Sequence, residues 1–361
     1  MGGGEDLGFR ACRFLARHEP LEEWKVFVMR TRRSALLILA VVIAMITPTA
    51  ALAGNGTDGG SEPTTAEVTL FHTNDFHGRL ETDYASRGGS AYLARVVNSV
   101  RRSAGAETVA LLDAGDAYFA APAISQLLMG ESTIDIYNKM RYDVATFGNH
   151  EFDKGQEELA ARVEQSKFAW LGANVVLEGT EWDLPEWAQP YEILEMGSKS
   201  NPVKVGVLGL AGQETPEVTL IGTTAGLVFK DLTDTILHYR DMVLAEADAL
   251  VVLVHMGTED SGPYDGLATV AQKLIDAGKP VDLMIGGHQH QALFEPVVVG
   301  DTAIVSAGYY GRYLGQLDVT IEKSTKKLTV DDYELHTIIA EATIGSLTAD
   351  LDAFYEDDQI Y

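Results

Sequence analysis

Cysteine is almost absent from this sequence of 361 residues. The single cysteine, Cys12, lies close to the N-terminus, ahead of the main part of the chain. That main part therefore has no disulfide and no thiolate ligand for a metal ion. Any metal ion bound there must be held by oxygen and nitrogen donors.

Basic residues are also scarce. Lysine and arginine number 27 against 53 aspartates and glutamates, which gives a formal net charge of −26 at pH 7. The acidic residues are spread along the chain, so they predict a strongly solvated acidic surface. Because such a surface repels a phosphate backbone, the composition argues against a nucleic-acid polymer as partner.

Only one long apolar run is present. Ala35–Ile46 follows the basic segment Arg30–Arg33, and Pro48 ends the run ahead of the small residues Ala51–Ala53. This order is typical of a signal peptide. We interpret residues 29–53 as a signal peptide cleaved after Ala53, and residues 1–28 as an over-extended start. The protein would then be exported to the periplasm or the cell exterior; an uncleaved membrane anchor is the alternative.

The rest of the chain divides by composition. Residues 54–67 are rich in glycine, threonine and serine and predict a flexible linker. Beyond them, short apolar runs typical of buried strands alternate with segments of helical periodicity, which predicts an α/β fold with largely parallel strands. Strands are predicted at Val68–Phe71, Val109–Leu112, Val205–Leu210, Ala249–Val254 and Val281–Ile285, and helices at Ala91–Val100, Gln156–Gln165, Leu232–Ala245 and Leu267–Ala277.

A different pattern follows near residue 317. Apolar Leu317, Val319 and Ile321 alternate with polar residues, and the turn Lys323–Lys326 leads into a second short run that begins at Leu328. This pattern predicts an antiparallel hairpin. The sheets are therefore expected to be mixed.

Polar clusters follow the ends of the predicted strands. In open α/β sheets, ligands bind outside the carboxyl ends of the strands. Two divalent ions about 3.5 to 4 Å apart require a bridging carboxylate and several further ligands. Seven side chains at these strand ends meet that demand: Asp75, His77, Asp116, Asn149, His255, His288 and His290.

Each cluster alone has an ordinary structural explanation. Asp75 could cap a turn beside a surface histidine, Asn149 could belong to a simple turn, and His255 could be a core histidine. A shared metal site is favoured because five of the eight histidines after residue 53 fall in these clusters. For His72 and His238, which lie outside the clusters, we expect packing or solvent exposure.

In these motifs the chain resembles the calcineurin-like metallophosphoesterases. The segment Asn149–Asp153, with the sequence Asn-His-Glu-Phe-Asp, resembles the branch that contains 5′-nucleotidases, UDP-sugar hydrolases and 2′,3′-cyclic-nucleotide phosphodiesterases. The resemblance implies a catalytic domain over residues 68–338 with a layered α/β/β/α sandwich of two mixed sheets flanked by helices. The motifs that carry it are Asn74–Gly78, Asp113–Asp116, Gly148–Asp153, His255–Gly257 and Gly286–His290.

The resemblance also implies a role for each side chain. One metal ion would be held by Asp75, His77, Asp116 and His290, and the second by Asp116, Asn149, His255 and His288, with Asp116 as the bridge. His150 would contact the phosphoryl oxygen or the leaving group, Asp153 would orient the His150 ring, and Asn149 would also touch the phosphate. The two ions would be divalent Mn, Zn, Co or Fe.

These roles imply a secreted dinuclear phosphoric ester hydrolase of nucleotide catabolism. Two cations would activate water for in-line attack on a small-molecule phosphate ester, such as a nucleotide or a related compound. Two other classes stay open: a non-catalytic secreted remnant or binding protein, and a thiosulfohydrolase-like relative that acts on a sulfur-containing carrier.

The last residues of the chain raise a question about substrate choice. Residues 339–361 carry a helical apolar stripe that resembles the helix leading into the nucleotide-specificity domain of full-length 5′-nucleotidases. The sequence ends before such a domain. This leaves open a truncated or split reading frame and a free-standing catalytic domain with broader substrate choice.

Overall fold

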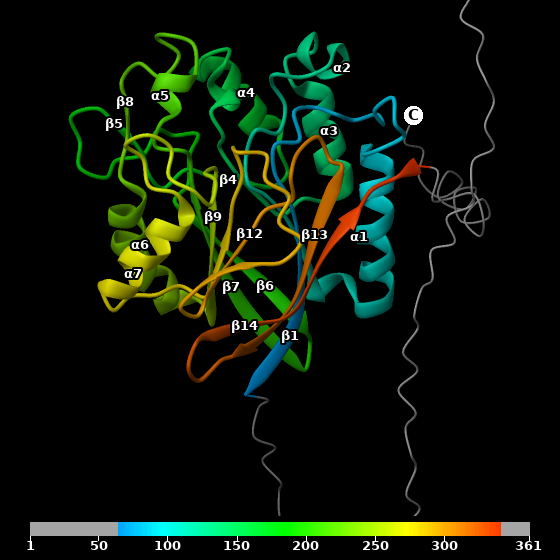
Figure 1. The fold of residues 1–361 in the computed structure, drawn as a ribbon, viewed down its shortest axis with the longest axis vertical. Coiled ribbons are helices and arrows are strands. Elements are labelled where there is room, and N and C mark those ends of the chain that lie inside the picture. The colour runs from blue at the N-terminus through cyan, green and yellow to red at the C-terminus, as the bar shows by residue number, and fades with distance from the viewer. Residues whose placement is uncertain (1–63, 341–361) are drawn as a thin grey trace, which may run out of the picture. The chain divides into compact units, whose positions relative to one another are not determined.

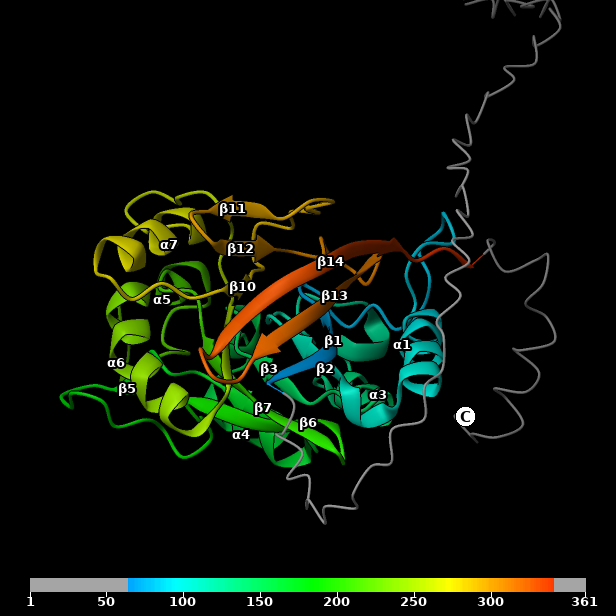
Figure 2. The ribbon, with the colours of Figure 1, turned by 90° about the horizontal axis from the view of Figure 1, so that it is seen from below.

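The computed structural model describes residues 64–340. Two six-stranded sheets lie face to face, and helices cover the outer face of each sheet (Figures 1 and 2). The predicted layered α/β/β/α sandwich is therefore confirmed. The predictions for residues 1–28 and 29–53, and nearly all of the predicted C-terminal helix, lie outside the described residues.

The first sheet has the strand order β14-β13-β1-β2-β3-β4. β1 to β4 run parallel, and β13 and β14 add antiparallel at one edge. The strands are β1 (Thr65–Thr73), β2 (Val109–Asp113), β3 (Val144–Thr146), β4 (Ala169–Leu171), β13 (Tyr313–Glu322) and β14 (Lys327–Thr337). The helices that follow them are α1 (Ser90–Ala104), α2 (Ala123–Gln126), α3 (Glu131–Met140) and α4 (Gln156–Gln165), with 3₁₀ turns at Ala106–Thr108 and His150–Phe152.

The second sheet has the order β11-β12-β10-β9-β7-β6. Its four inner strands run parallel, and both edge strands are antiparallel. The strands are β6 (Tyr191–Ser198), β7 (Asn201–Leu210), β9 (Ala249–Val254), β10 (Leu283–Ile285), β11 (Val297–Val299) and β12 (Thr302–Val305). Helices α6 (Leu232–Glu246) and α7 (Leu267–Asp276) cover this sheet; α5 (Thr215–Val218) and the small pair β5 (Val175–Leu177) and β8 (Leu227–Phe229) lie near one end (Figure 1).

Three apolar interfaces hold the layers together. The inner faces of the two sheets meet in one cluster, which includes Leu70, Leu112 and Leu253. A second cluster joins the first sheet to α1, α3 and α4, and a third joins the second sheet to α6 and α7. Because β9 has apolar layers on both faces, all six of its residues are buried, as its unbroken apolar sequence predicts.

Several predicted boundaries were wrong. The linker was predicted to extend to residue 67, but β1 already begins at Thr65 because Thr65 to Glu67 pair with residues of β13. The strand predicted to begin at Val281 begins at Leu283, and the carbonyl oxygen of Val281 accepts a hydrogen bond from the hydroxyl group of Thr302. Within residues 64–340, no helix has the length and apolar character needed to span a bilayer.

Candidate metal centre

The candidate site lies where the parallel strands of both sheets end. The loops after β1, β2 and β3 supply donors from the first sheet, and the loops after β9 and β10 supply donors from the second. Backbone hydrogen bonds join neighbouring loops. The amide of Asp75 donates to the carbonyl oxygen of Gly115, and the amide of His77 donates to the carbonyl oxygen of Asp116. The site is thus built from five segments that are distant in sequence.

The first group of donors consists of Asp75, His77 and His290, whose ligand atoms all lie within 4.8 Å of one another. Nε2 of His290 lies 3.3 Å from Oδ1 of Asp75 and 3.3 Å from Nε2 of His77. Asp75 and His77 are buried, whereas the His290 side chain is 35% exposed. Solvent therefore reaches the group at His290.

The second group consists of Asp116, His255 and His288, again with ligand atoms within 4.8 Å of one another. Oδ2 of Asp116 lies 3.1 Å from Nε2 of His255 and 3.8 Å from Nε2 of His77 in the first group. Asp116 therefore stands between the two groups, which is the place that a bridging carboxylate requires.

The charges in the centre are matched to one another. Burial lowers the pKa of His255, but attraction to the Asp116 carboxylate outweighs burial and raises that pKa to about 10. Burial raises the pKa of Asp116, yet the same attraction holds it well below its usual range. Burial lowers the pKa of both His77 and His288, so neutral imidazoles with free lone pairs are available at neutral pH.

Backbone carbonyl groups fix the tautomers of two histidines. Nδ1 of His77 donates to the carbonyl oxygen of Phe119 at 2.9 Å, and Nδ1 of His255 donates to that of Ala114 at 2.7 Å. Since a carbonyl oxygen can only accept, the proton of each neutral ring lies on Nδ1. Nε2 of each ring therefore faces the other donors and is the nitrogen that can ligate a metal ion once it is deprotonated.

One buried atom in the centre lacks the partner that it needs. Oδ1 of Asn149 is shielded from solvent and makes no hydrogen bond within residues 64–340. A buried polar atom without a partner is costly, and a bound cation removes that cost for a lone pair. With the carboxylates of Asp75 and Asp116 beside them, the donors fit divalent metal ions.

Backbone strain is concentrated at the same residues. Five of the seven predicted ligands adopt positive φ angles: Asp75 (50°), His77 (49°), Asp116 (58°), His288 (68°) and His290 (54°). This left-handed conformation is unfavourable for residues other than glycine and is found preferentially at functional sites. The strain independently marks these residues as a site.

His150 lies beside both groups. Its ring centroid is 5.2 Å from that of His77, and its backbone amide donates to Oδ1 of Asp116 at 2.9 Å. Nδ1 of His150 lies 2.8 Å from Oδ2 of Asp153. Burial lowers the pKa of His150, but the hydrogen bond to Asp153 and nearby carboxylates outweigh burial and raise it. The ring is thus oriented and suited to carry a proton.

Sequence reasoning assigned no role to Glu151, although it lies in the predicted motif. Its fully buried carboxylate accepts hydrogen bonds from the backbone amides of Asp116 (2.8 Å), Ala117 (2.8 Å) and Gly148 (2.7 Å). Burial and the Asp116 carboxylate raise the pKa of Glu151 to about 8. Glu151 therefore ties the loop after β2 to the loop after β3.

Close packing explains one of the motif glycines. A Cβ atom on Gly148 would lie 2.1 Å from Oδ1 of Asp116. Any side chain at this position would therefore displace the central carboxylate.

Two further residues escaped sequence reasoning. Asn74 donates from Nδ2 to Oδ2 of Asp75 at 2.7 Å and so orients that carboxylate. Glu214, which lies beyond β7, is buried and places Oε1 2.5 Å from Nε2 of His288. No short motif surrounds Glu214 in the sequence; only the fold brings it to the centre.

Parallel strands of two sheets that end in histidine and aspartate groups define a metallophosphoesterase fold. A family model described as "Calcineurin-like phosphoesterase" matches residues 68–292. The chain therefore belongs to the calcineurin-like phosphoesterase family, as the resemblance of its motifs predicts.

Individual relatives agree with this family. The chain is 31% identical over 288 residues to the human 5′-nucleotidase, an alignment that covers 71% of this chain and 47% of that protein. It is 29% identical over 366 residues to the cell wall protein Lmo0130 of Listeria monocytogenes, covering 87% and 44%. The structure of a 5′-nucleotidase precursor from Thermus thermophilus superposes with a TM-score of 0.63 at 25% identity, covering 76% and 55%. The chain spans about half the length of these relatives.

Proposed function

We propose that this protein is a dinuclear metal-dependent phosphoesterase of the 5′-nucleotidase type. The observation that carries the proposal is the presence of two groups of donors that meet at Asp116, which also lies with His77 and His150 in a third group of possible ligands. One group unites Asp75, His77 and His290, and the other unites Asp116, His255 and His288. Two cations bridged by one carboxylate require this arrangement.

The remaining side chains have roles that follow from their positions. Asn149 would complete the second group, since its buried Oδ1 lacks a partner among the described residues. His150 would stand at the phosphoryl group, with Asp153 holding its ring in place through the contact at 2.8 Å. When bound, the divalent ions would supply Lewis-acid stabilisation of the phosphoryl oxygens and a nucleophile at neutral pH.

His150 is suited to a proton-transfer step. Its raised pKa favours the protonated form of the ring, and a protonated imidazole can donate a proton to a departing alkoxide. Asp153 would stabilise the charged ring during that step. The histidine would thus lower the barrier to leaving-group departure.

The substrates would be phosphate esters of nucleotides or related small molecules. Similarity to proteins named 5′-nucleotidase supports this class, as does the acidic surface, which disfavours polymeric nucleic acid. Similarity to a cell wall protein supports export, in agreement with the signal peptide proposed for residues 29–53.

A substrate panel tests the activity. Protein stripped with a chelator and reloaded separately with Mn²⁺, Co²⁺, Zn²⁺ or Fe²⁺ is assayed with nucleoside monophosphates, UDP-sugars, 2′,3′-cyclic nucleotides and an aryl phosphodiester. We expect no turnover in the stripped form and restored turnover with at least one metal, at two ions per chain. Binding of at most one ion per chain, or equal rates in the stripped and reloaded forms, would contradict the proposal.

Two variants separate metal binding from chemistry. Asp116→Asn is expected to lose both turnover and bound metal, because the central carboxylate serves both groups. His150→Asn is expected to lose turnover by about 100-fold or more while its metal content stays near wild type. Wild-type rates in His150→Asn would remove that residue from the mechanism.

Export is tested on the native protein in its own cells. Fractionation followed by N-terminal sequencing of the mature protein is expected to find Gly54 as the first residue outside the cytoplasm. A mature protein that begins before residue 34 and sediments with membranes would favour the anchor instead.

A further inference from the structure

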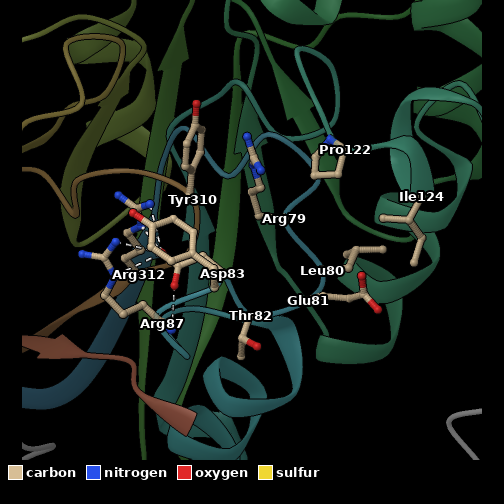
Figure 3. A pocket seen from close by; sticks show the side chains of 11 residues that line it. Arg79, Leu80, Glu81, Thr82, Asp83, Arg87, Pro122, Ile124, Tyr310 and Arg312 are labelled. Carbon is tan, nitrogen blue, oxygen red and sulfur yellow. Dashed lines mark hydrogen bonds and ion pairs between the residues drawn. The ribbon is translucent and has the colours of Figure 1, made fainter. Parts of the chain in front are cut away.

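A cavity of about 420 Å³ opens next to the candidate metal centre. It is formed by the loop that follows β1, by residues near α2 and by Tyr310 and Arg312 from the loop before β13 (Figure 3). Its volume falls within the range of small-molecule pockets. None of the metal-donor residues lines it, so it is a space of its own.

One aromatic ring separates the cavity from the metal centre. Tyr310 lines the cavity, and its ring packs edge-on against His77 at 5.6 Å and against His290 at 5.8 Å between centroids. Its backbone amide donates to the carbonyl oxygen of Asp75 at 2.8 Å. The cavity and the metal donors thus share Tyr310 as a neighbour, and a substrate that binds at both would have to pass this ring.

Arg79 presents an unpaired cation to this cavity. It follows His77 by two residues, and its Cζ lies 4.2 Å from the centre of the Tyr310 ring. Within residues 64–340 the Arg79 guanidinium has no carboxylate partner, and its buried Nε makes no hydrogen bond. In Figure 3 the side chain stands between Tyr310 and Pro122.

The other two arginines of the cavity are bound differently. Nη2 of Arg87 and Nη2 of Arg312 lie 2.9 Å and 3.0 Å from the same oxygen of Asp83. Burial raises the pKa of Asp83, but hydrogen bonds from Arg87 outweigh burial and lower it to about 2. One carboxylate thus holds two guanidinium groups, and the cluster keeps a net positive charge.

The cavity is positively charged, whereas the chain as a whole is strongly acidic. Arg79, Arg87 and Arg312 face only Asp83 and the exposed Glu81 among the lining residues. The whole chain carries a net charge of −26. A planar guanidinium without a partner recognises carboxylate or phosphate groups through paired hydrogen bonds.

We propose that this cavity binds a second anionic group carried by the leaving group of the substrate. The preferred substrates are then phosphate esters whose alcohol part bears a carboxylate or a further phosphate, with Arg79 as the recognising residue. Pro122 and Ile124 supply an apolar wall for the carbon skeleton between the two anions. This inference rests on the proposed phosphoesterase function.

Matched substrates test the inference. Phenyl phosphate is compared with its 2-, 3- and 4-carboxy derivatives, which place a carboxylate at three distances from the scissile group. We expect the wild-type, metal-loaded protein to favour at least one carboxy derivative in kcat/KM. Arg79→Gln should lower kcat/KM for that derivative about 10- to 100-fold more than for phenyl phosphate, the usual effect of losing a charged hydrogen bond.

Two further variants serve as controls. Arg79→Lys keeps the charge but not the paired donors and should recover part of the preference. Arg102→Gln removes an exposed arginine at the end of α1, away from the cavity, and should match wild type on every substrate. Circular dichroism of each variant verifies the fold.

The possible outcomes are distinct. If Arg79→Gln lowers kcat/KM equally for phenyl phosphate and its carboxy derivatives, Arg79 acts at the scissile phosphoryl group and the inference is wrong. The inference is also wrong if Arg79→Gln leaves kcat/KM unchanged for every substrate. If the wild type hydrolyses none of these esters, the proposed function fails instead. In that case, calorimetry measures the affinity of wild type and Arg79→Gln for phenylphosphonate and for its carboxy derivatives. The inference requires that Arg79→Gln lose affinity selectively for the carboxy derivatives.

Discussion

Nε2 of His288 lies 2.5 Å from Oε1 of Glu214, a buried carboxylate on a loop of the second sheet. The negative charge of Glu214 at this distance favours the His288 tautomer with its proton on Nε2, which would leave the Nδ1 lone pair for a metal ion. His77 and His255 use backbone carbonyl groups for the same purpose, with the opposite nitrogen free.

Replacing Glu214 is therefore expected to weaken metal binding at the second group. Glu214→Ala should lower metal affinity about 10- to 100-fold, as loss of a residue that orients a ligand does in other metal sites. Titration of the stripped protein with Zn²⁺ or Mn²⁺ measures the change. Glu217→Gln, an exposed neighbour on α5, is the matched control; equal affinities for both variants would show that Glu214 does not position His288.

Asp153 is expected to control the titration of His150. Its hydrogen bond is the main cause that raises the His150 pKa against the opposing effect of burial. Asp153→Asn should therefore lower the pKa of His150, which NMR titration of the ring protons in the metal-free protein measures. Turnover should fall about 10- to 100-fold. An unchanged His150 pKa in the variant would mean that Asp153 has another role.

Glu151 is expected to be structural rather than reactive. Its two oxygens accept from three backbone amides, and a glutamine would turn an NH₂ group toward one of those donors. Glu151→Gln should lower the free energy of unfolding by about 1 to 3 kcal/mol, measured with urea on metal-free protein. Glu157→Gln on the exposed face of α4 should leave that free energy within about 0.5 kcal/mol of wild type. Similar free energies of unfolding for the two variants would show that the hydrogen bonds of Glu151 between the two loops do not stabilise the fold.

His72 is expected to make the fold sensitive to acid. Its ring is fully buried, neither nitrogen has a hydrogen-bond partner among the described residues, and burial lowers its pKa to about 3. The unfolded chain takes up a proton near pH 6.5 and the folded one does not, so stability falls by about 1.4 kcal/mol per unit as pH drops from 6.5 toward 3.

Substitution by an apolar residue isolates this contribution. His72→Leu removes the titrating group. The free energy of unfolding of the variant minus that of wild type should therefore be about 1.4 kcal/mol larger at pH 5.5 than at pH 7.5. Thermal or urea unfolding at both pH values measures the difference. A constant difference between the two pH values would show that the His72 ring does not stay neutral in the folded protein.

The sequence predicted most of the architecture because its strongest signals are local. Unbroken apolar runs such as Ala249–Val254 match observed strands in kind and closely in length. Weaker strands were missed: Tyr191–Ser198 is an edge strand with most residues only half-buried, so its sequence carries neither a buried run nor a clean alternation. The helix Glu131–Met140 was missed as well. It lacks an acidic or hydroxyl cap, since Gly130 precedes it.

The candidate site divides in the same way. Motif residues such as Asp116 and His288 could be found from sequence because they lie directly after apolar strands. Glu214 and Arg79 could not be assigned roles, because each contacts a residue that is distant in sequence. Glu214 contacts His288, and Arg79 contacts Tyr310. The positive φ angles at the donors also arise only when the loops are assembled.

The position of β1 sets the order in which the protein can be assembled. β1 lies between β2 and β13, and Thr65 pairs with Glu322. The first described strand therefore has one neighbour, β13, that comes more than 200 residues later in the chain. All of the metal donors, from Asp75 to His290, lie on the chain between these two partners. The sheet that anchors the first donor loop can therefore close only after residues 313–322 have been synthesised.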